Sequence, residues 1–148
     1  YGHVETIRER IEHLALLREI QDKNIAGHYG FITFIPWPFR DKETPLREIY
    51  GVRSSYNAPD YLRMIAISRI MLNNIANIQA SVLTVGKETG TVSLHAGAND
   101  LGSIMIEENV VSAAGSSYRF DSNQLTSIIR EAGFTPVLRD QKYEPKSI

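Results

Sequence analysis

At residues 78–83 the sequence reads Ile-Gln-Ala-Ser-Val-Leu, a short apolar run that lies between two helical patterns. The first pattern begins at Pro59, and the second spans Lys87 to His95 before Gly97. We expect residues 78–83 to form a strand, because short apolar runs bounded by turn residues are typical of buried strands. Strands that alternate with helices pair in parallel through right-handed crossovers. This stretch therefore places the chain in the α/β class.

Two helix starts carry the same local signal. Thr6 with Glu9 forms a capping-box pattern, and apolar residues then recur at helical spacing as far as about Asp22. Asp121 with Gln124 repeats this pattern before another apolar stripe. The sequence therefore predicts amphipathic helices near both ends of the chain.

Strands and loops complete the expected order. Residues 31–35 are β-branched and aromatic and end at Pro36, which predicts a buried strand. We expect parallel pairing in chain order, from the segment around Val4 through residues 31–35 and 78–83 to residues 98–103. The other expected elements are a long loop with one short helical turn at 40–59, a helix at 59–72, a weaker strand at 98–104, a helical segment at 107–114 and an extended segment at 134–138.

The expected strands are too few for a closed barrel of eight strands. The chain also starts abruptly, without Met, on Tyr-Gly-His-Val-Glu directly before a helix start. Residues 1–148 are therefore expected to form a single α/β domain that is half of a TIM-type barrel, with parallel strands and flanking helices. Half a barrel has two open edges, and inward residues such as Phe34, Ile35 and Ser81 lose their opposing wall. We expect self-association or a partner that carries the missing half.

The charge balance argues against nucleic-acid and membrane partners. The chain has 16 basic and 17 acidic residues and a net charge of -1, so no overall field attracts polyanions. No apolar run approaches the roughly 20 residues that a bilayer span requires, and the first residues lack a signal-peptide pattern. We expect a cytoplasmic protein with a small-molecule substrate, no nucleic acid and no membrane.

Cysteine is absent from the chain. This chain therefore supplies no disulfide, no thiolate nucleophile and no thiolate-bound zinc or iron–sulfur site. His13, His28 and His95 have no spacing that resembles a metal site. We expect no metal ligands in this chain.

Four segments, taken in order, resemble one group of radical S-adenosylmethionine enzymes. They are Tyr-Gly-His-Val-Glu-Thr at 1–6, Gly-Phe-Ile-Thr-Phe-Ile-Pro-Trp-Pro-Phe at 30–39, Asn-Ile-Gln-Ala-Ser at 77–81, and Gly-Ala-Asn-Asp-Leu-Gly-Ser at 97–103 with Met-Ile-Glu-Glu-Asn at 105–109. The group serves the menaquinone futalosine pathway and deazaflavin synthesis, and the chain is most similar to the cyclic dehypoxanthine futalosine synthases. The resemblance covers nearly the whole chain and implies strands five to eight of the enzyme's barrel plus a C-terminal tail.

The resemblance implies an enzyme that uses S-adenosylmethionine and a four-iron four-sulfur cluster. In that group a Cys-x-x-x-Cys-x-x-Cys loop holds the cluster, and this chain has none, so it is expected to be inactive alone. The implied reaction closes dehypoxanthine futalosine to its cyclic form, after a 5'-deoxyadenosyl radical abstracts hydrogen from the ribose. Aminodeoxyfutalosine or deazaflavin synthesis on the same scaffold is an alternative. A non-catalytic α/β module that binds a ligand or a partner chain is another.

The first candidate site residues are Gly2, His3 and Glu5. They lie at the carboxyl end of the first expected strand, where barrel enzymes keep their chemistry. By resemblance they border the nucleoside of S-adenosylmethionine, so we assign them to cofactor binding. A carboxylate near a helix start is also explained by the helix dipole alone.

Two further pairs are candidates for substrate binding. Phe34 and Trp37 form an aromatic strand exit that suits a planar aromatic ligand, although a core role is equally compatible. Gln79 and Ser81 are two residues apart and are expected on one face of a strand, where they bind either substrate or structural partners.

The last candidates for substrate binding lie in the fourth expected strand and in the segment after it. Asn99, Asp100 and Ser103 are unusually polar for a barrel interior, although a turn role also fits the Asn-Asp pair. Glu107 and Glu108 begin a helical segment, where the helix dipole favours carboxylates whatever the function. We assign these five residues to substrate binding with that structural alternative open.

Overall fold

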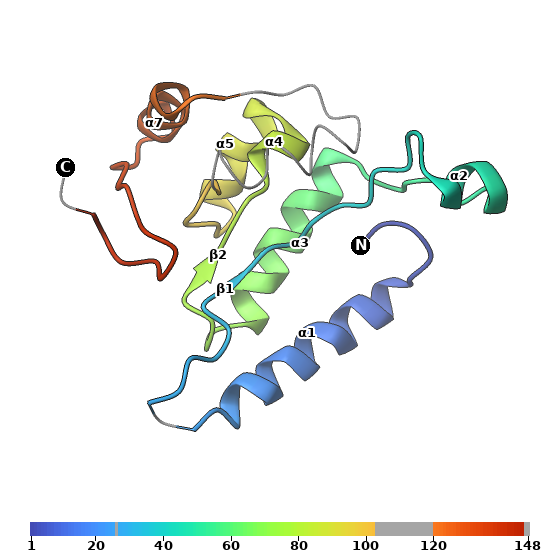
Figure 1. Cartoon of the computed structure of the whole chain (residues 1–148), viewed down its shortest axis with the longest axis horizontal. Helices are drawn as coiled ribbons and strands as arrows, with labels where there is room; N and C mark the ends of the chain where they lie inside the picture. Colours follow the sequence, from blue (N-terminus) through green and yellow to red (C-terminus); the bar gives the residue numbers. More distant parts are fainter. Residues whose placement is uncertain (26, 103–119, 147–148) are drawn as a thin grey trace.

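The chain combines helices with a very small parallel sheet (Figure 1). The computed structural model describes residues 1–25, 27–102 and 120–146. Within these ranges the elements are α1 Ile7–Asp22, β1 Thr33–Phe34, α2 Pro45–Tyr50, α3 Ala58–Met71, β2 Asn77–Ile78, α4 Val82–Val85, α5 Lys87–His95 and α7 Ser122–Glu131. The alternation of helices and parallel strands confirms the α/β class.

The helices expected from local signals are present. Thr6 and Glu9 form a reciprocal capping box before α1, and Asp121 and Gln124 form another before α7. α5 has the expected bounds, and α2 is the short helical turn that was expected in the long loop. The expected segment at 107–114 lies outside the described residues. Local capping chemistry therefore determines these helix starts.

The sheet is parallel, but its strands are shorter than expected. β1 and β2 pair through Thr33 with Asn77 and through Phe34 with Ile78. A single parallel bridge between Gln79 and Asp100 extends the pairing to the last expected strand. The parallel order of these three segments is confirmed. The expected strand lengths at 31–35, 78–83 and 98–104 are wrong, because only two residues or one in each segment pair.

The segment before α1 makes its parallel contact at a different residue than expected. Val4 is not in a strand, and its side chain is exposed. Tyr1 instead donates its amino group to the carbonyl of Trp37 at 2.9 Å and accepts a hydrogen bond from the N–H of Phe39 at 2.6 Å. These two bonds follow the slanted pattern of parallel pairing. Tyr1, and not Val4, therefore makes the parallel contact, and its partners are Trp37 and Phe39 beyond β1 instead of residues 31–35.

The second half of the stretch at 78–83 is helical. α4 starts at Val82, where a strand was expected, and ends at Gly86, which has a positive φ of 85°. All four residues of α4 are buried. A short apolar run does not distinguish a strand from a buried helical turn by its periodicity, which explains this error.

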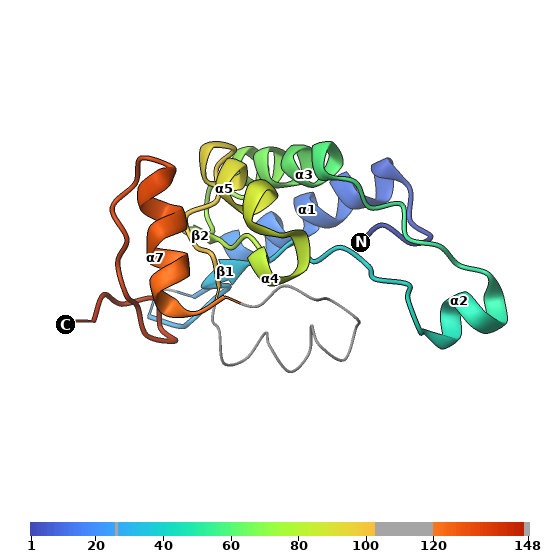
Figure 2. The ribbon, with the colours of Figure 1, turned by 90° about the horizontal axis from the view of Figure 1, so that it is seen from above.

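The helices are gathered on one side of the strands. Figure 2 shows α1, α3 and α5 together on one side of β1 and β2, with α2 at one end of the molecule and α7 at the other. Both α2 and α3 lie between β1 and β2 in the chain, and α3 contacts α1, α5 and β2. This arrangement places connecting helices on one face of a parallel sheet.

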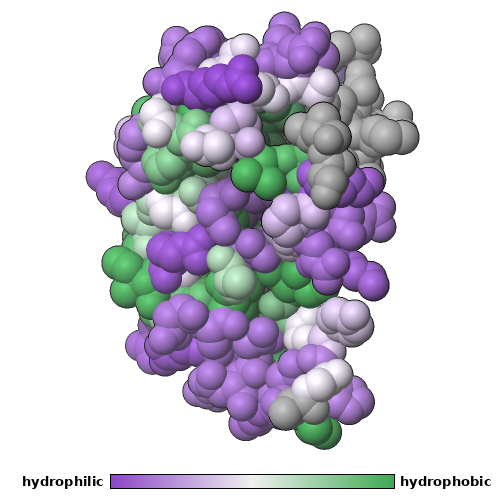
Figure 3. Space-filling model, turned by 90° about the vertical axis from the view of Figure 1, so that its left-hand side faces the viewer, coloured by the Kyte–Doolittle hydropathy of each residue, from purple (hydrophilic) through white to green (hydrophobic). Residues whose placement is uncertain are grey.

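Hydrophobic side chains also reach the surface. Figure 3 shows hydrophobic areas between hydrophilic ones on one face of the molecule. The large side chains of Tyr29, Val137 and Leu138 are more than half exposed. None of the helices in the described ranges is both long enough and apolar enough to traverse a bilayer.

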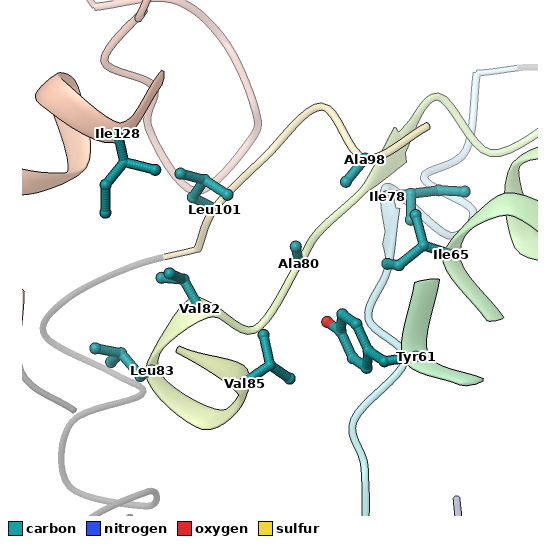
Figure 4. Packing of buried hydrophobic residues seen from close by; sticks show 10 residues of the cluster. All are labelled: Tyr61, Ile65, Ile78, Ala80, Val82, Leu83, Val85, Ala98, Leu101 and Ile128. Carbon is teal, nitrogen blue, oxygen red and sulfur yellow. The ribbon is translucent and has the colours of Figure 1, made fainter. Parts of the chain in front are cut away.

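Two hydrophobic clusters form the core. In the larger one, Tyr61 and Ile65 from α3 meet Ile78 from β2, the residues of α4, and Ile128 from α7 (Figure 4). The smaller cluster joins α1 to α3 through Leu14, Met64 and neighbouring residues. α3 contributes to both clusters, so it is the central helix of the described structure.

Candidate functional site

Three of the candidate segments lie where paired segments end. The Gly2–Glu5 turn follows the contact of Tyr1 with Trp37 and Phe39, Trp37 follows β1, and Ser81 follows β2. In parallel sheets the carboxyl ends of neighbouring strands lie at the same edge, and ligands bind there. The topology therefore brings these three segments to one edge of the sheet.

Glu5 is the centre of a compact polar turn. Its Oε1 accepts hydrogen bonds from the N–H of Gly2 at 2.5 Å and from Arg10 Nε at 2.6 Å. Its Oε2 accepts from the N–H of His3 at 3.2 Å and lies 2.7 Å from His3 Nδ1. Burial alone would raise the pKa of the Glu5 carboxyl, but the N–H groups of Gly2, Glu5 and His3 and the Arg10 guanidinium hold this pKa well below its usual range.

The turn brings all three candidate cofactor residues together. Gly2 has a positive φ of 92°, a conformation that glycine adopts without strain, and its carbonyl accepts from the N–H of Ser55 at 2.8 Å. The His3 ring lies against the ring of Phe39 with 5.3 Å between centroids and is partly exposed. Glu5 therefore orients the turn, and the His3 and Phe39 rings form its accessible part.

Replacing Glu5 with glutamine is expected to lower the free energy of unfolding by about 1–2 kcal/mol at neutral pH, because hydrogen bonds to a charged acceptor are lost. The lowered pKa of Glu5 means that its contribution is complete above the unfolded pKa of about 4.3 and is lost as the pH falls below it. Denaturant unfolding of wild type and Glu5→Gln over a pH series should therefore show a difference that shrinks in acid.

Glu12→Gln is the matched control for this experiment. Glu12 forms an exposed ion pair with Arg8 on α1, and such pairs contribute little. A wild-type minus Glu5→Gln difference that stays constant down to low pH would contradict the charge-based explanation of the turn.

The two aromatic candidates, Phe34 and Trp37, lie in different environments. Phe34 is half-buried and packs on the cluster between α1 and α3, which matches the core alternative. Trp37 is 38% exposed, and its Nε1 donates to the hydroxyl of buried Thr84 at 2.9 Å. Trp37 is therefore the aromatic residue available at the strand end, and α4 fixes its orientation.

Gln79 and Ser81 do not lie on one strand face, because β2 ends at Ile78 and Ser81 precedes α4. The Ser81 N–H donates to the hydroxyl of Tyr61 at 2.9 Å. The Ser81 hydroxyl is buried and has no hydrogen-bond partner among the described residues. A buried hydroxyl without a partner is uncommon, and a bound ligand is one way to satisfy it.

Asn99 and Asp100 are held by protein groups. The Asn99 side-chain oxygen accepts from the N–H of Ile78 at 2.8 Å and from Arg69 Nη2 at 2.9 Å. The Asp100 carboxylate pairs with Arg139 through both oxygens and accepts the N–H of Gly102 at 2.6 Å. These contacts favour the structural alternative for both residues. Arg69 and Arg139 hold these two residues, but they belong to no local motif, so the sequence did not indicate this role.

Ser103, Glu107 and Glu108 lie outside the described residues. In the described part of the chain, no group of three or more His, Cys, Asp or Glu side chains is placed to hold a metal ion. His95 instead packs on Phe134, with 5.1 Å between ring centroids.

A pocket of about 250 Å³ lies in the long loop expected at residues 40–59. It is lined by Arg40, Asp41, Lys42, Ser54 and Tyr56. The Ser54 hydroxyl donates to the carbonyl of Phe39 at 2.7 Å, which links the pocket to the ring that packs on His3. The sequence indicated the loop, but it did not indicate which of these residues would converge.

Most of the chain matches a known protein family. Residues 28–148 match the family model described as "CofH/MqnC C-terminal region". The chain belongs to this family. The match includes Trp37, Gln79, Ser81 and Asp100, whereas the Gly2–Glu5 turn precedes it.

Individual relatives support the same assignment. The chain is 48% identical over 97% of its length to a cyclic dehypoxanthine futalosine synthase of Streptomyces coelicolor, and 42% identical over 97% to one of Halalkalibacterium halodurans. It is 37% identical over 100% of its length to a 5-amino-6-(D-ribitylamino)uracil–L-tyrosine 4-hydroxyphenyl transferase of Methanopyrus kandleri. The chain spans 34%, 36% and 40% of these relatives, respectively.

Proposed function

We propose that this chain is the C-terminal part of a radical S-adenosylmethionine enzyme that converts dehypoxanthine futalosine to its cyclic form in menaquinone biosynthesis. The observation that carries this proposal is the 48% identity over 97% of the chain to a cyclic dehypoxanthine futalosine synthase. Because the chain spans about a third of that relative's length, the activity is proposed for a larger protein that contains it.

The proposed fold of that larger protein is a barrel to which this chain contributes four of the parallel segments. Tyr1, β1, β2 and Asp100 follow one another in chain order. Tyr1 bonds to Trp37 and Phe39 beyond β1 in the parallel pattern, β1 pairs with β2, and Gln79 beyond β2 bridges to Asp100. α1, α3 and α5 connect them, as in repeated strand–helix units. This order supports half of a TIM-type barrel.

The residues of the chain fit the proposed cofactors only in part. When bound, S-adenosylmethionine and a four-iron four-sulfur cluster supply the radical that begins ring closure. The chain has no cysteine, so the cluster ligands must come from another part of the protein. The Gly2–Glu5 turn fits a nucleoside better, because the partly exposed His3 ring offers a flat face.

The substrate would be held at the edge where β1 and β2 end. Trp37 offers an aromatic surface of fixed orientation to the benzoate ring of the substrate. The buried Ser81 hydroxyl lacks a partner among the described residues, and a substrate oxygen or N–H would satisfy it. Both residues bind and orient the substrate in this proposal.

The test uses the complete gene product that carries this sequence, purified anaerobically with its cluster. It is incubated with S-adenosylmethionine, a reductant and dehypoxanthine futalosine, and products are identified by mass spectrometry. We expect the cyclic product, and 5'-deoxyadenosine in equal amount if S-adenosylmethionine is consumed. The 148-residue chain alone is the control and should form neither compound. An intact, cluster-loaded enzyme that leaves dehypoxanthine futalosine unchanged would contradict the proposal.

A second candidate function rests on the Methanopyrus kandleri relative, which is 37% identical over the whole chain. Its name describes transfer of a 4-hydroxyphenyl group from L-tyrosine to 5-amino-6-(D-ribitylamino)uracil. Incubating the same enzyme with these two compounds separates the candidates. Formation of the coupled product without cyclisation of dehypoxanthine futalosine would favour this function.

We propose that another copy of this chain, or the other half of the barrel, packs against the open sheet edges. Exposed hydrophobic side chains such as Tyr29, Val137 and Leu138 support this proposal. Size-exclusion chromatography of the isolated chain, with mass spectrometry of the same sample, should show an assembly. A stable monomer of 16.7 kDa without a second polypeptide would contradict it.

A further inference from the structure

The chain folds back on itself after α7, in residues 138–146, which we call the tail turn. Arg139 and Pro145 form an antiparallel bridge, and the Asp140 carboxylate accepts two backbone N–H groups of the turn at 2.7 and 3.0 Å. Arg139 Cζ lies 3.7 Å from the centroid of the Tyr143 ring. The tail turn thus presents Arg139 and Tyr143 as one unit.

Arg139 and Tyr143 each form hydrogen bonds with one of the candidate substrate residues. Arg139 Nη2 donates to Asp100 Oδ1 at 3.0 Å, and Arg139 Nε donates to Asp100 Oδ2. The Tyr143 hydroxyl donates to Gln79 Oε1 at 3.2 Å. Gln79 and Asp100 are also the two residues of the parallel bridge beyond β2. The tail turn therefore contacts the chain just beyond β2, where the single bridge between Gln79 and Asp100 continues the parallel pairing.

The contacts have consequences for the neighbouring backbone. The Asp100 side chain is only 11% exposed, so its charge depends on Arg139 for compensation. Asp100 in turn accepts the N–H of Gly102, and its carbonyl accepts the N–H of Ala80 at 2.8 Å. Ala80 directly precedes Ser81, whose hydroxyl is one of the buried polar groups without a partner among the described residues. Hydrogen bonds through Asp100 thus connect Arg139 to Ala80, the residue before Ser81.

We propose that Arg139 and Tyr143 are positioning residues of the substrate pocket, which hold Asp100 and Gln79 so that the chain at Ser81 keeps its binding geometry. This inference rests on the proposed function. Arg139 acts through Asp100, and Tyr143 acts through Gln79. The tail turn accordingly supports the proposed substrate site, although it lies far from Ser81 in the sequence.

The test uses Arg139→Lys and Tyr143→Phe in the complete enzyme. Lysine keeps the charge but not the two-pronged contact, and phenylalanine keeps the ring but not the hydroxyl. We expect KM for dehypoxanthine futalosine to rise about tenfold in Arg139→Lys and about threefold in Tyr143→Phe, with kcat nearly unchanged, because binding is weakened uniformly. A purely structural loss would reduce the active fraction, and so kcat, at constant KM.

Hydrogen exchange gives a second readout that needs no substrate. The N–H of Gly102 donates to Asp100, so its exchange should become at least several-fold faster in Arg139→Lys. Arg63→Lys and Tyr29→Phe are the matched controls, since Arg63 forms an exposed ion pair with Asp60 and Tyr29 is 79% exposed. Both controls should leave KM and Gly102 exchange unchanged.

Three outcomes are decisive. Unchanged Gly102 exchange in Arg139→Lys would overturn the inference, and so would a fall in kcat at constant KM in both variants. A wild-type enzyme without cyclising activity would overturn the proposed function instead. Exchange at Gly102 would then still decide whether the tail turn holds Asp100.

Discussion

Replacing Ile65 with alanine is expected to lower the free energy of unfolding by about 2–5 kcal/mol, the usual range for deleting a large aliphatic side chain from a core. Ile65 is fully buried on α3, in the cluster that joins this helix to β2, α4 and α7. The deletion removes methyl and methylene groups from water-free contacts and leaves a cavity that the surrounding elements fill only partly. Denaturant unfolding followed by circular dichroism should show a lower midpoint with an unchanged slope.

Ile70→Ala is the matched control for Ile65→Ala. The same substitution is made in the same helix, but the side chain of Ile70 is 77% exposed. Its loss should change stability by less than about 0.5 kcal/mol. Equal effects of the two substitutions would show that α3 does not carry the core in the way its burial indicates.

The helices were predictable because their signals are local. Thr6 with Glu9, and Asp121 with Gln124, are each three residues apart and satisfy one another's backbone groups whatever the rest of the chain does. The strands depend on partners instead. The apolar residues of α4 fit a buried strand equally well, and only tertiary packing decides that Val82 begins a helix.

The sequence indicated the candidate residues at the strand ends, but it did not indicate the residues that hold them in place. The Gly2–Glu5 turn, Trp37 and Ser81 stand out in the sequence because glycine, aromatic and polar residues there interrupt apolar runs. Their partners carry no such pattern. Tyr143 and Gln79 are 64 residues apart, and Arg139 and Asp100 are 39 apart, so neither contact produces a periodicity or a motif.

The same lack of local signal applies to Arg69, which joins α3 to the last parallel segment. Its guanidinium donates to the carbonyls of Gly97 at 2.7 Å and Ala76 at 3.1 Å, and to the Asn99 side chain at 2.9 Å. The same Asn99 side-chain oxygen also accepts a hydrogen bond from the N–H of Ile78 in β2. Arg69 thus connects the residue before β2 to the loop after α5, and this connection depends on the close approach of Arg69 to Gly97.

Replacing Gly97 with alanine is therefore expected to lower the free energy of unfolding by about 2–4 kcal/mol, from backbone strain and overpacking together. Gly97 has a φ of +119°, which residues with a side chain rarely adopt. A methyl group there would lie 2.8 Å from Arg69 Cβ and 2.9 Å from Arg69 Cγ. Those atoms are close to the α3 backbone and have little freedom to move, so the guanidinium contacts should be displaced.

Gly133→Ala separates the two causes. Gly133 also has a positive φ, of +82°, but an added methyl group would meet no atom within 4 Å. This control should cost only the backbone strain, about 1 kcal/mol. Chemical denaturation of both variants gives the difference, and faster hydrogen exchange at Ile78 in Gly97→Ala would trace the effect through Asn99. If Gly97→Ala is no less stable than Gly133→Ala, Arg69 is not held as closely as described, and the connection between α3 and the last parallel segment must rest on other contacts.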